Sequence, residues 1–244
     1  MIPNTESSQP VQAVLFDLDD TLFDHQHSTR CALRDMQLSF PQLAAIPLAE
    51  LEHANRHLLD TFHAQVLRGE LTLEAARLAR FQHLLHRFDV PTTVASVADV
   101  ASRYRAVYQA ERRAVPGVLA LLNALRPHVQ LGIITNNLAQ EQYEKLRICG
   151  LDTLFDCIII SAEVGMAKPD PAIFQLTLDR LSCAPQHAVM VGDSWTADIV
   201  PAATLGLRTI WLNRYGMTCP AREVTTEITA FEPLEATLRL LLQP

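Results

Sequence analysis

Four aspartates follow directly on an apolar segment near the start of the chain. Residues 11–16 are Val-Gln-Ala-Val-Leu-Phe, and carboxylates then stand at Asp17, Asp19, Asp20 and Asp24. An unpaired carboxylate is costly to bury, so the acids are expected at the carboxyl end of a buried strand. Because side chains alternate along a strand, Asp17 and Asp19 can point to one side, where hard oxygen ligands favour Mg²⁺ over Zn²⁺. The alternative is an acidic turn that caps the next helix.

Further polar residues stand where other predicted strands end. Thr135 and Asn136 close one strand, and Asp193 closes another, with Asp198 one helical turn further on. Lys168, one of only two lysines in the sequence, precedes a predicted helix. The carboxyl ends of parallel strands share one sheet edge, so these residues are expected to converge as metal ligands, phosphate-binding groups and a balancing cation. Each also has an ordinary alternative, namely a helix cap at Thr135, an Asx turn at Asp193 and a common loop composition at Lys168.

Beyond residue 113 the sequence alternates between strand and helix patterns. Alternation of this kind predicts an α/β fold with a Rossmann-like, mostly parallel sheet and helices on both faces. The later strands are expected at 129–135, 156–161, 188–191 and 208–212, and the helices at 115–125, 138–149, 171–181, 195–205 and 233–242.

Residues 25–113 differ in character from the rest of the chain. They are rich in Leu, Ala, Arg, Gln and His at helical spacing, and their apolar stripes predict about four helices. Thr72 is expected to cap one helix after Gly69 ends the one before it. We therefore expect a catalytic core formed by residues 1–24 and 114–244, interrupted after its first strand by an all-helical domain at 25–113.

Charge and composition narrow the possible partners. The net charge is −7, while the segment 25–113 holds 11 Arg against 9 acidic residues, so the acidic excess lies in the core. Nucleic acid polymers need a dense basic face, whereas this distribution suits a small anionic substrate with a cation. Five scattered cysteines without a CxxC pair are typical of reduced thiols and favour the cytoplasm.

Neither membrane association nor secretion is expected. No apolar segment approaches the length of a membrane span, and residues 1–12 lack the pattern of a signal peptide. The first ten or so residues are expected to form a loose tail.

Four motifs in order give the chain a family resemblance. The segment Asp17-Leu18-Asp19-Asp20-Thr21-Leu22 resembles the DxDxT motif of the haloacid dehalogenase superfamily of phosphotransferases. Thr135, Lys168, and Gly192-Asp193-Ser194 with Asp198 resemble its second, third and fourth motifs. The helical insertion is similar to the C1 cap of that superfamily. A finer similarity, to bacterial noncanonical pyrimidine nucleotidases and nucleoside 5′-monophosphatases, rests on Gly69-Glu70-Leu71-Thr72, Ile133-Ile134-Thr135-Asn136 and residues 163–169.

The resemblance implies a Mg²⁺-dependent phosphatase that hydrolyses small phosphorylated metabolites through an aspartyl-phosphate. Asp17 would be the nucleophile, Asp19 the general acid and base, and Lys168 the cation that offsets negative charge. Phosphoryl oxygens would be held by Lys168, Thr135, Asn136 and backbone N–H groups near Leu18 and Asp20. The metal ligands implied are Asp17, the backbone carbonyl of Asp19, Asp193, and Asp198 either as a ligand or behind one.

Several other activities share this scaffold. A haloacid dehalogenase is disfavoured because enzymes with that chemistry lack the second aspartate, here Asp19. A sugar phosphomutase and a phosphoglycolate or sugar-phosphate phosphatase share the core residues, and a non-catalytic regulator is a further alternative. The motifs do not indicate the oligomeric state of the protein.

Histidines are frequent in the insertion, with seven between His25 and His86. His53 and His57 have the i, i+4 spacing of a helical metal-binding pair. Without a third ligand nearby, such histidines are more typical of solvated helix faces than of a metal site.

Overall fold

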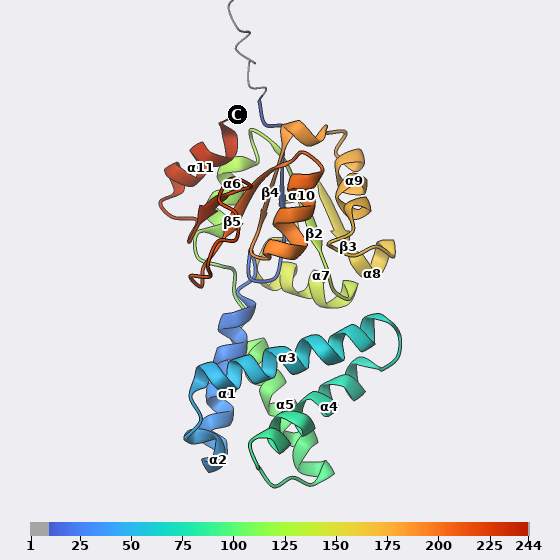
Figure 1. Ribbon diagram of the computed structural model, residues 1–244, viewed down its shortest axis with the longest axis vertical. Helices are drawn as coiled ribbons and strands as arrows, with labels where there is room; N and C mark the ends of the chain where they lie inside the picture. Colours follow the sequence, from blue (N-terminus) through green and yellow to red (C-terminus); the bar gives the residue numbers. More distant parts are fainter. Residues whose placement is uncertain (1–9, 244) are drawn as a thin grey trace, which may run out of the picture. The chain divides into compact units, whose positions relative to one another are not determined.

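The computed structural model describes residues 10–243 and divides into two compact units (Figure 1). The α/β unit comprises Met1–Phe23 and Ala114–Pro244, and the helical unit comprises Asp24–Arg113. The chain passes between them after Phe23, one residue before the predicted position, and again after Arg113. Residues 1–9, most of the expected tail, lie outside the described residues.

A parallel sheet forms the centre of the α/β unit. Over the described residues it has six strands in the order β3-β2-β1-β4-β5-β6. β1 lies between β2 and β4, with Phe16 opposite Ile133 on one side and Val191 on the other. The carboxyl ends of these three strands therefore meet at one edge. The strands are β1 (Ala13–Phe16), β2 (Gln130–Thr135), β3 (Cys157–Ile160), β4 (Ala188–Gly192), β5 (Arg208–Leu212) and β6 (Thr226–Ile228).

Helices cover both faces of the sheet, which confirms the expected fold class. On one face, Leu15 and Met190 pack against Phe174 of α9 in a single apolar cluster. Val14 and Phe16 alternate with these residues and are fully buried on the opposite face, where α6 and α11 pack on each other (Figure 1). The helices are α6 (Val118–Leu125), α7 (Ala139–Ile148), α8 (Ser161–Val164), α9 (Pro171–Arg180), α10 (Val200–Thr204) and α11 (Leu234–Leu242).

Three elements of this unit differ from the sequence expectation. The helix expected at 195–205 is a π-helix, Trp195–Ile199, followed by the short α10. Edge strand β6 was not predicted, because Thr226-Glu227-Ile228 is mostly exposed and has no apolar run. Ser161, expected to end a strand, instead begins α8.

The helical unit is built on α1, which packs against α3 and α5, while α3 packs on α4. Thr72 caps α4 as predicted, its side chain accepting from the N–H of Ala75. The expected apolar stripe of α4 is present at Phe81, Leu84 and Leu85, but near its start Ala76 is buried in place of Ala75. Apolar side chains of the five helices form one core, which includes Leu33, Leu43, Leu51, Phe81 and Val100. The helices are α1 (His25–Ser39), α2 (Pro41–Ala44), α3 (Leu48–Leu67), α4 (Leu73–Arg87) and α5 (Val94–Ala110).

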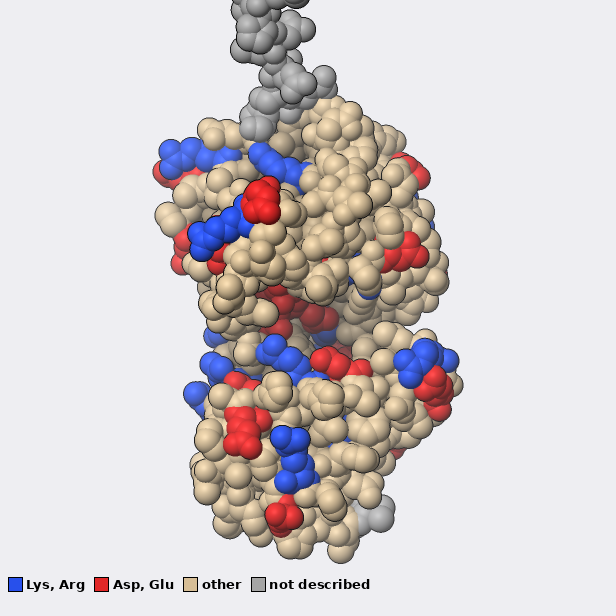
Figure 2. All heavy atoms as spheres, in the orientation of Figure 1, with Lys and Arg blue, Asp and Glu red and all other residues tan. Residues whose placement is uncertain are grey.

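The surface offers no strong polymer-binding feature on the face drawn in Figure 2. Basic and acidic side chains occur there in small mixed groups and not as a dense basic patch. His53 and His57 are exposed, as expected for a solvated helix face. Within the described residues, none of the helices combines the length and apolar composition that crossing a membrane requires. The expected lack of affinity for nucleic acid polymers remains a prediction.

Candidate active site

Three carboxylates meet where β1 and β4 end. Asp17 directly follows β1, and its N–H donates to the carbonyl of Val191 in β4, so the ladder extends to the first acidic residue. Asp193 directly follows β4, and Asp198 lies in the π-helix that comes next. Carboxylate oxygens of Asp17, Asp193 and Asp198 all lie within 4.8 Å of one another. The sequence-predicted convergence of these acids is therefore present in the fold.

The π-helix and a glycine together fix the position of Asp198. Its Oδ2 accepts from the backbone N–H of Ser194 at 3.0 Å, while the Ser194 hydroxyl caps the helix by accepting from Ala197 N–H. A Cβ placed on Gly192 would lie 2.5 Å from Cβ and Cγ of Asp198. Only glycine therefore leaves room for Asp198 to reach the strand end.

Lys168 joins two of the three carboxylates. Its Nζ donates to Oδ1 of Asp17 and to Oδ1 of Asp198, both at 2.6 Å, and its side chain is buried. Burial opposes the charged ammonium, but the carboxylates of Asp17 and Asp198 outweigh it and raise the pKa of Lys168. Lys168 is therefore a fixed positive charge in the site.

Asn136 holds the backbone of Lys168 at two points. Its Nδ2 donates to the Lys168 carbonyl and its Oδ1 accepts from the Lys168 N–H, each at 2.8 Å. These two hydrogen bonds make Asn136 a positioning residue for that lysine. The expectation that Asn136 also holds a phosphoryl oxygen stays a prediction, because the amide has a second N–H.

The acidic group carries more negative charge than the fold neutralises. Burial raises the pKa of Asp17 to about 7, with Lys168 opposing the shift and Asp198 adding to it. Burial, together with the charges of Asp17 and Asp198, also raises the pKa of Asp193. Such shifts mark a place where an additional positive charge would be bound favourably.

The second aspartate of the motif has a separate partner. Lys145, on α7, donates through Nζ to both oxygens of Asp19, at 2.6 and 2.8 Å, and to Oε1 of Gln142 at 2.7 Å. Gln142 Nε2 in turn donates to Asp19 Oδ2 at 3.1 Å and to Thr135 Oγ1 at 2.5 Å. Since Gln142 supplies the donor to the Thr135 oxygen, the hydroxyl proton of that buried threonine is left to donate elsewhere.

The Asp19 side chain is bound to Lys145 and Gln142 and lies outside the three-carboxylate group. The metal ligand expected at this residue, its backbone carbonyl, stays a prediction. One other sequence expectation is corrected by this geometry. The Asp20 N–H, expected to bind a phosphoryl oxygen, donates to the carbonyl of Phe23 at 2.7 Å. Asp20 has a left-handed backbone (φ 62°), which turns the loop at this point.

Sequence reasoning missed Lys145 and Gln142. Both are buried, and they stand one helical turn apart on α7, the helix that follows the Thr135 strand end. A signal was available: a polar pair at i, i+3 shares one helix face. The helix that carries this pair, α7, begins only a few residues after Thr135, which was a predicted site residue.

The sequence comparison decides the family. Residues 11–206 match the family of haloacid dehalogenase-like hydrolases. The chain belongs to this family. The resemblance inferred from the four motifs is thereby confirmed.

Known relatives of this HAD-like hydrolase cover most of its length. The HAD-hydrolase YfnB of Bacillus subtilis (strain 168) is 31% identical over 208 residues, which is 83% of this chain and 84% of that protein. Its solved structure, described as bound to magnesium, has a TM-score of 0.70 and 28% identity, and covers 94% of this chain and 99% of that one.

Two further relatives have names that specify a substrate. A glyceraldehyde 3-phosphate phosphatase of Pyrococcus abyssi is 31% identical over 211 residues, covering 84% of this HAD-like hydrolase and 82% of that protein. The pyrimidine 5′-nucleotidase YjjG of Escherichia coli (strain K12) is 30% identical over 204 residues, covering 83% and 86%.

Proposed function

We propose that this HAD-like hydrolase is a Mg²⁺-dependent phosphomonoesterase that acts on small phosphorylated metabolites through an aspartyl-phosphate at Asp17. The class of enzyme is a phosphatase, in agreement with the names of its relatives. The observation that carries the proposal is the separate placement of two aspartates. Asp17 lies with Asp193, Asp198 and Lys168, whereas Asp19 is held by Lys145.

The acidic group fits a divalent cation. Four carboxylates, those of the three-carboxylate group and Asp19, face two ammonium groups, Lys145 and Lys168. The excess of two negative charges and the all-oxygen donor set suit Mg²⁺. Asp17, Asp193 and the Asp19 carbonyl would hold the ion, with Asp198 as a ligand or behind it. When bound, Mg²⁺ would neutralise charge on the phosphoryl group and on the approaching carboxylate.

Asp17 supplies the nucleophile. Lys168 occupies its Oδ1, so the second oxygen is the one available to attack. As the bond from this oxygen to phosphorus forms, the bond from phosphorus to the ester oxygen of the substrate breaks. Lys168 offsets the repulsion between the carboxylate and the anionic phosphoryl group, because its ammonium stays charged between Asp17 and Asp198.

Asp19 moves the protons of both steps. It gives a proton to the leaving alkoxide and then takes one from the water that attacks the aspartyl-phosphate, which restores Asp17 and releases phosphate. Lys145 and Gln142 fix the Asp19 carboxylate on two sides, so the same oxygens serve both steps. Thr135 donates its free hydroxyl proton to a phosphoryl oxygen, since Gln142 already fills the acceptor side.

Substrate choice within this class is the finer part of the proposal. Nucleoside 5′-monophosphates are favoured by the motif similarity to nucleotidases and by the relative YjjG, a pyrimidine 5′-nucleotidase. Sugar or triose phosphates are the alternative, supported by the Pyrococcus relative. A phosphomutase uses the same core groups and is a further alternative. A haloacid dehalogenase is disfavoured, because its reaction has no leaving alkoxide for Asp19, held by Lys145, to protonate.

Phosphate release from a substrate panel tests the proposal. The panel contains nucleoside 5′-monophosphates, sugar phosphates, glyceraldehyde 3-phosphate and phosphoglycolate, each assayed with Mg²⁺ and with excess chelator. Asp17→Asn should abolish turnover, whereas Asp152→Asn, which changes an exposed aspartate, should leave it unchanged. Normal turnover by Asp17→Asn, or full activity in chelator, would refute the mechanism. If no nucleotide is preferred, only the nucleotidase assignment fails.

A further inference from the structure

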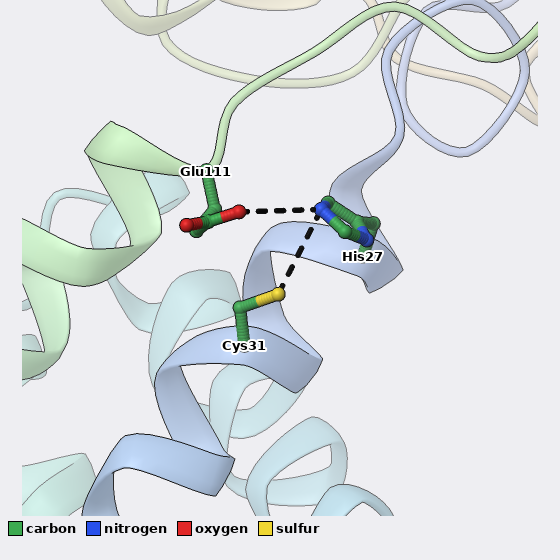
Figure 3. A group of neighbouring side chains, drawn as sticks. All are labelled: His27, Cys31 and Glu111. Atoms are coloured by element: carbon green, nitrogen blue, oxygen red, sulfur yellow. Dashed lines mark hydrogen bonds and ion pairs between the residues drawn. The ribbon is translucent and has the colours of Figure 1, made fainter.

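The helical unit contains a group of three potential metal ligands that the proposed reaction does not use. His27 and Cys31 lie on α1, and Glu111 directly follows α5 (Figure 3). The His27 Nε2 lies 3.5 Å from Glu111 Oε2 and 3.7 Å from Cys31 Sγ. One ligand atom from each residue falls within 4.8 Å of the others. The structure thus places two further potential ligands, a thiol and a carboxylate, beside His27. The sequence pattern of the histidines did not indicate them.

The distances match those of a tetrahedral metal ion. Zinc bonds of about 2.1 Å to nitrogen and oxygen and about 2.3 Å to sulfur place ligand atoms about 3.4–3.6 Å apart. The two distances centred on His27, 3.5 and 3.7 Å, are close to that spacing before any metal is present. Little rearrangement is therefore needed to bind an ion.

The ligands are also held in place by the fold. His27 and Cys31 are four residues apart on α1 and so share one helix face. Across from them, the Ser28 hydroxyl donates to the Glu111 carbonyl at 3.0 Å, and Asp24 pairs with Arg113 at 2.9 Å. These contacts fasten the start of α1 to the residues after α5. Since they do not involve the three ligand groups, binding would not disrupt them.

We propose that His27, Cys31 and Glu111 form a transition-metal site with Zn²⁺ as its preferred ion. Imidazole, thiolate and carboxylate are the donors that zinc uses, while Mg²⁺ and Ca²⁺ prefer oxygen alone. A thiolate and a carboxylate together balance the charge of a divalent ion. The His27 and Glu111 side chains are 26% and 46% exposed, so an ion can enter from solvent and a water can complete the coordination.

The bound ion would link the first turns of α1 to the end of α5. These are the segments where the chain enters and leaves the helical unit. The expected consequence is a helical unit that opens less readily, with backbone exchange slowed at both of these ends.

Titration of metal-free, full-length protein with Co²⁺ tests the site. Cobalt bound to Cys31 gives a thiolate-to-metal charge-transfer absorption in the near ultraviolet, which an all-oxygen site cannot give. We expect this band to saturate at one equivalent, and we expect Zn²⁺ but not Mg²⁺ to abolish it. No band in the wild-type protein, or loss of the band on adding Mg²⁺, would overturn the proposal.

Variants separate this site from the active site and from other thiols. Cys31→Ser should remove the band. Glu111→Gln, at an exposed position, removes a direct ligand and should weaken Co²⁺ binding by at least the roughly 10- to 100-fold that the loss of an outer-shell partner costs. Asp193→Asn and Cys219→Ser should keep the band, since Asp193 lies in the acidic group and Cys219 elsewhere in the α/β unit. A band that survives in Cys31→Ser would overturn the assignment.

Hydrogen exchange provides an independent readout. Zn²⁺ should slow exchange at the start of α1 and the end of α5 in the wild-type protein, but not in Cys31→Ser. Equal exchange with and without Zn²⁺ would contradict a bridging site. Neither measurement depends on phosphatase activity.

Discussion

Lys145 donates to both carboxylate oxygens of Asp19, at 2.6 and 2.8 Å, although the two residues are 126 positions apart. The lysine side chain is only 4% exposed, while that of Asp19 is 27% exposed. An ammonium in this position favours the ionised carboxylate and fixes its direction. The Asp19 carboxylate nevertheless remains partly accessible to solvent. Lys145 is therefore a positioning residue for the proposed acid–base group.

Lys145→Met should lower kcat and move the acidic limb of the pH–rate profile to higher pH. The base step needs Asp19 ionised, and removal of the adjacent cation disfavours that form. A loss of about 10- to 100-fold is expected, below most of the roughly 10²- to 10⁴-fold attributed to general acid–base catalysis, because Asp19 itself remains in place. The measurement is kcat against pH with a saturating phosphomonoester. Arg147→Met removes a positive charge from the exposed side of the same helix and should leave the profile unchanged. A profile of wild-type shape in Lys145→Met would contradict this role.

Mg²⁺ affinity should rise with pH up to about pH 7. Burial raises the pKa of Asp17 to about 7 and that of Asp193 above its usual value, so protons compete with the ion for both carboxylates below that pH. Binding then releases protons, and affinity should change by about tenfold per pH unit for each proton displaced. Calorimetric titration with Mg²⁺ in buffers of different ionisation enthalpy measures both the affinity and the number of protons released. Affinity that does not vary between about pH 5 and pH 7 would exclude these carboxylates as the ligands.

The main effect of Gly192→Ala should be a loss of Mg²⁺ affinity, with a smaller effect on the free energy of unfolding. The added Cβ would lie 2.5 Å from Asp198, so the carboxylate must move away from Asp17 and Lys168. The matched control is Gly132→Ala, whose Cβ would lie 2.7 Å from the Leu15 side chain in the sheet interior. That variant should lose about 1–3 kcal/mol of unfolding free energy through overpacking and keep its Mg²⁺ affinity. Denaturant unfolding and Mg²⁺ titration of both variants distinguish the two effects, and equal Mg²⁺ affinity in both would refute the explanation.

The residues at the ends of predicted strands could be found from the sequence, because parallel topology alone brings them together. Asp17 and Asp193 directly follow β1 and β4, and Thr135 is the last residue of β2, which is adjacent to β1. Side-chain partners were harder to predict, since they depend on the direction in which each side chain points. The i, i+3 spacing of Gln142 and Lys145 marks a polar helix face, but the sequence does not indicate that this face is turned toward Asp19.

Two further structural details could not be predicted from the sequence pattern. The π-helix at Trp195–Ile199 cannot be distinguished from an α-helix by apolar spacing over five residues. The Asn136 amide had an obvious use in phosphate binding, and only the fold reveals that a lysine backbone 32 residues away occupies both of its ends. Contacts with residues distant in sequence thus decided the details that local patterns left open.

Asn136→Ala should impair catalysis through Lys168 and not through the metal. Two hydrogen bonds of 2.8 Å between the amide and the Lys168 backbone would be lost, each worth about 0.5–1.5 kcal/mol. The lysine would then be held less firmly between Asp17 and Asp198, so kcat/KM for phosphomonoesters should fall by roughly 10- to 100-fold. Mg²⁺ affinity, measured by calorimetry, should change little because the carboxylates keep their places. Asn123→Ala, which removes a side chain bonded only to a carbonyl of its own helix, serves as the control and should retain full activity. If Asn136→Ala keeps wild-type kcat/KM, or loses Mg²⁺ affinity as strongly as activity, the proposed positioning of Lys168 by Asn136 is wrong.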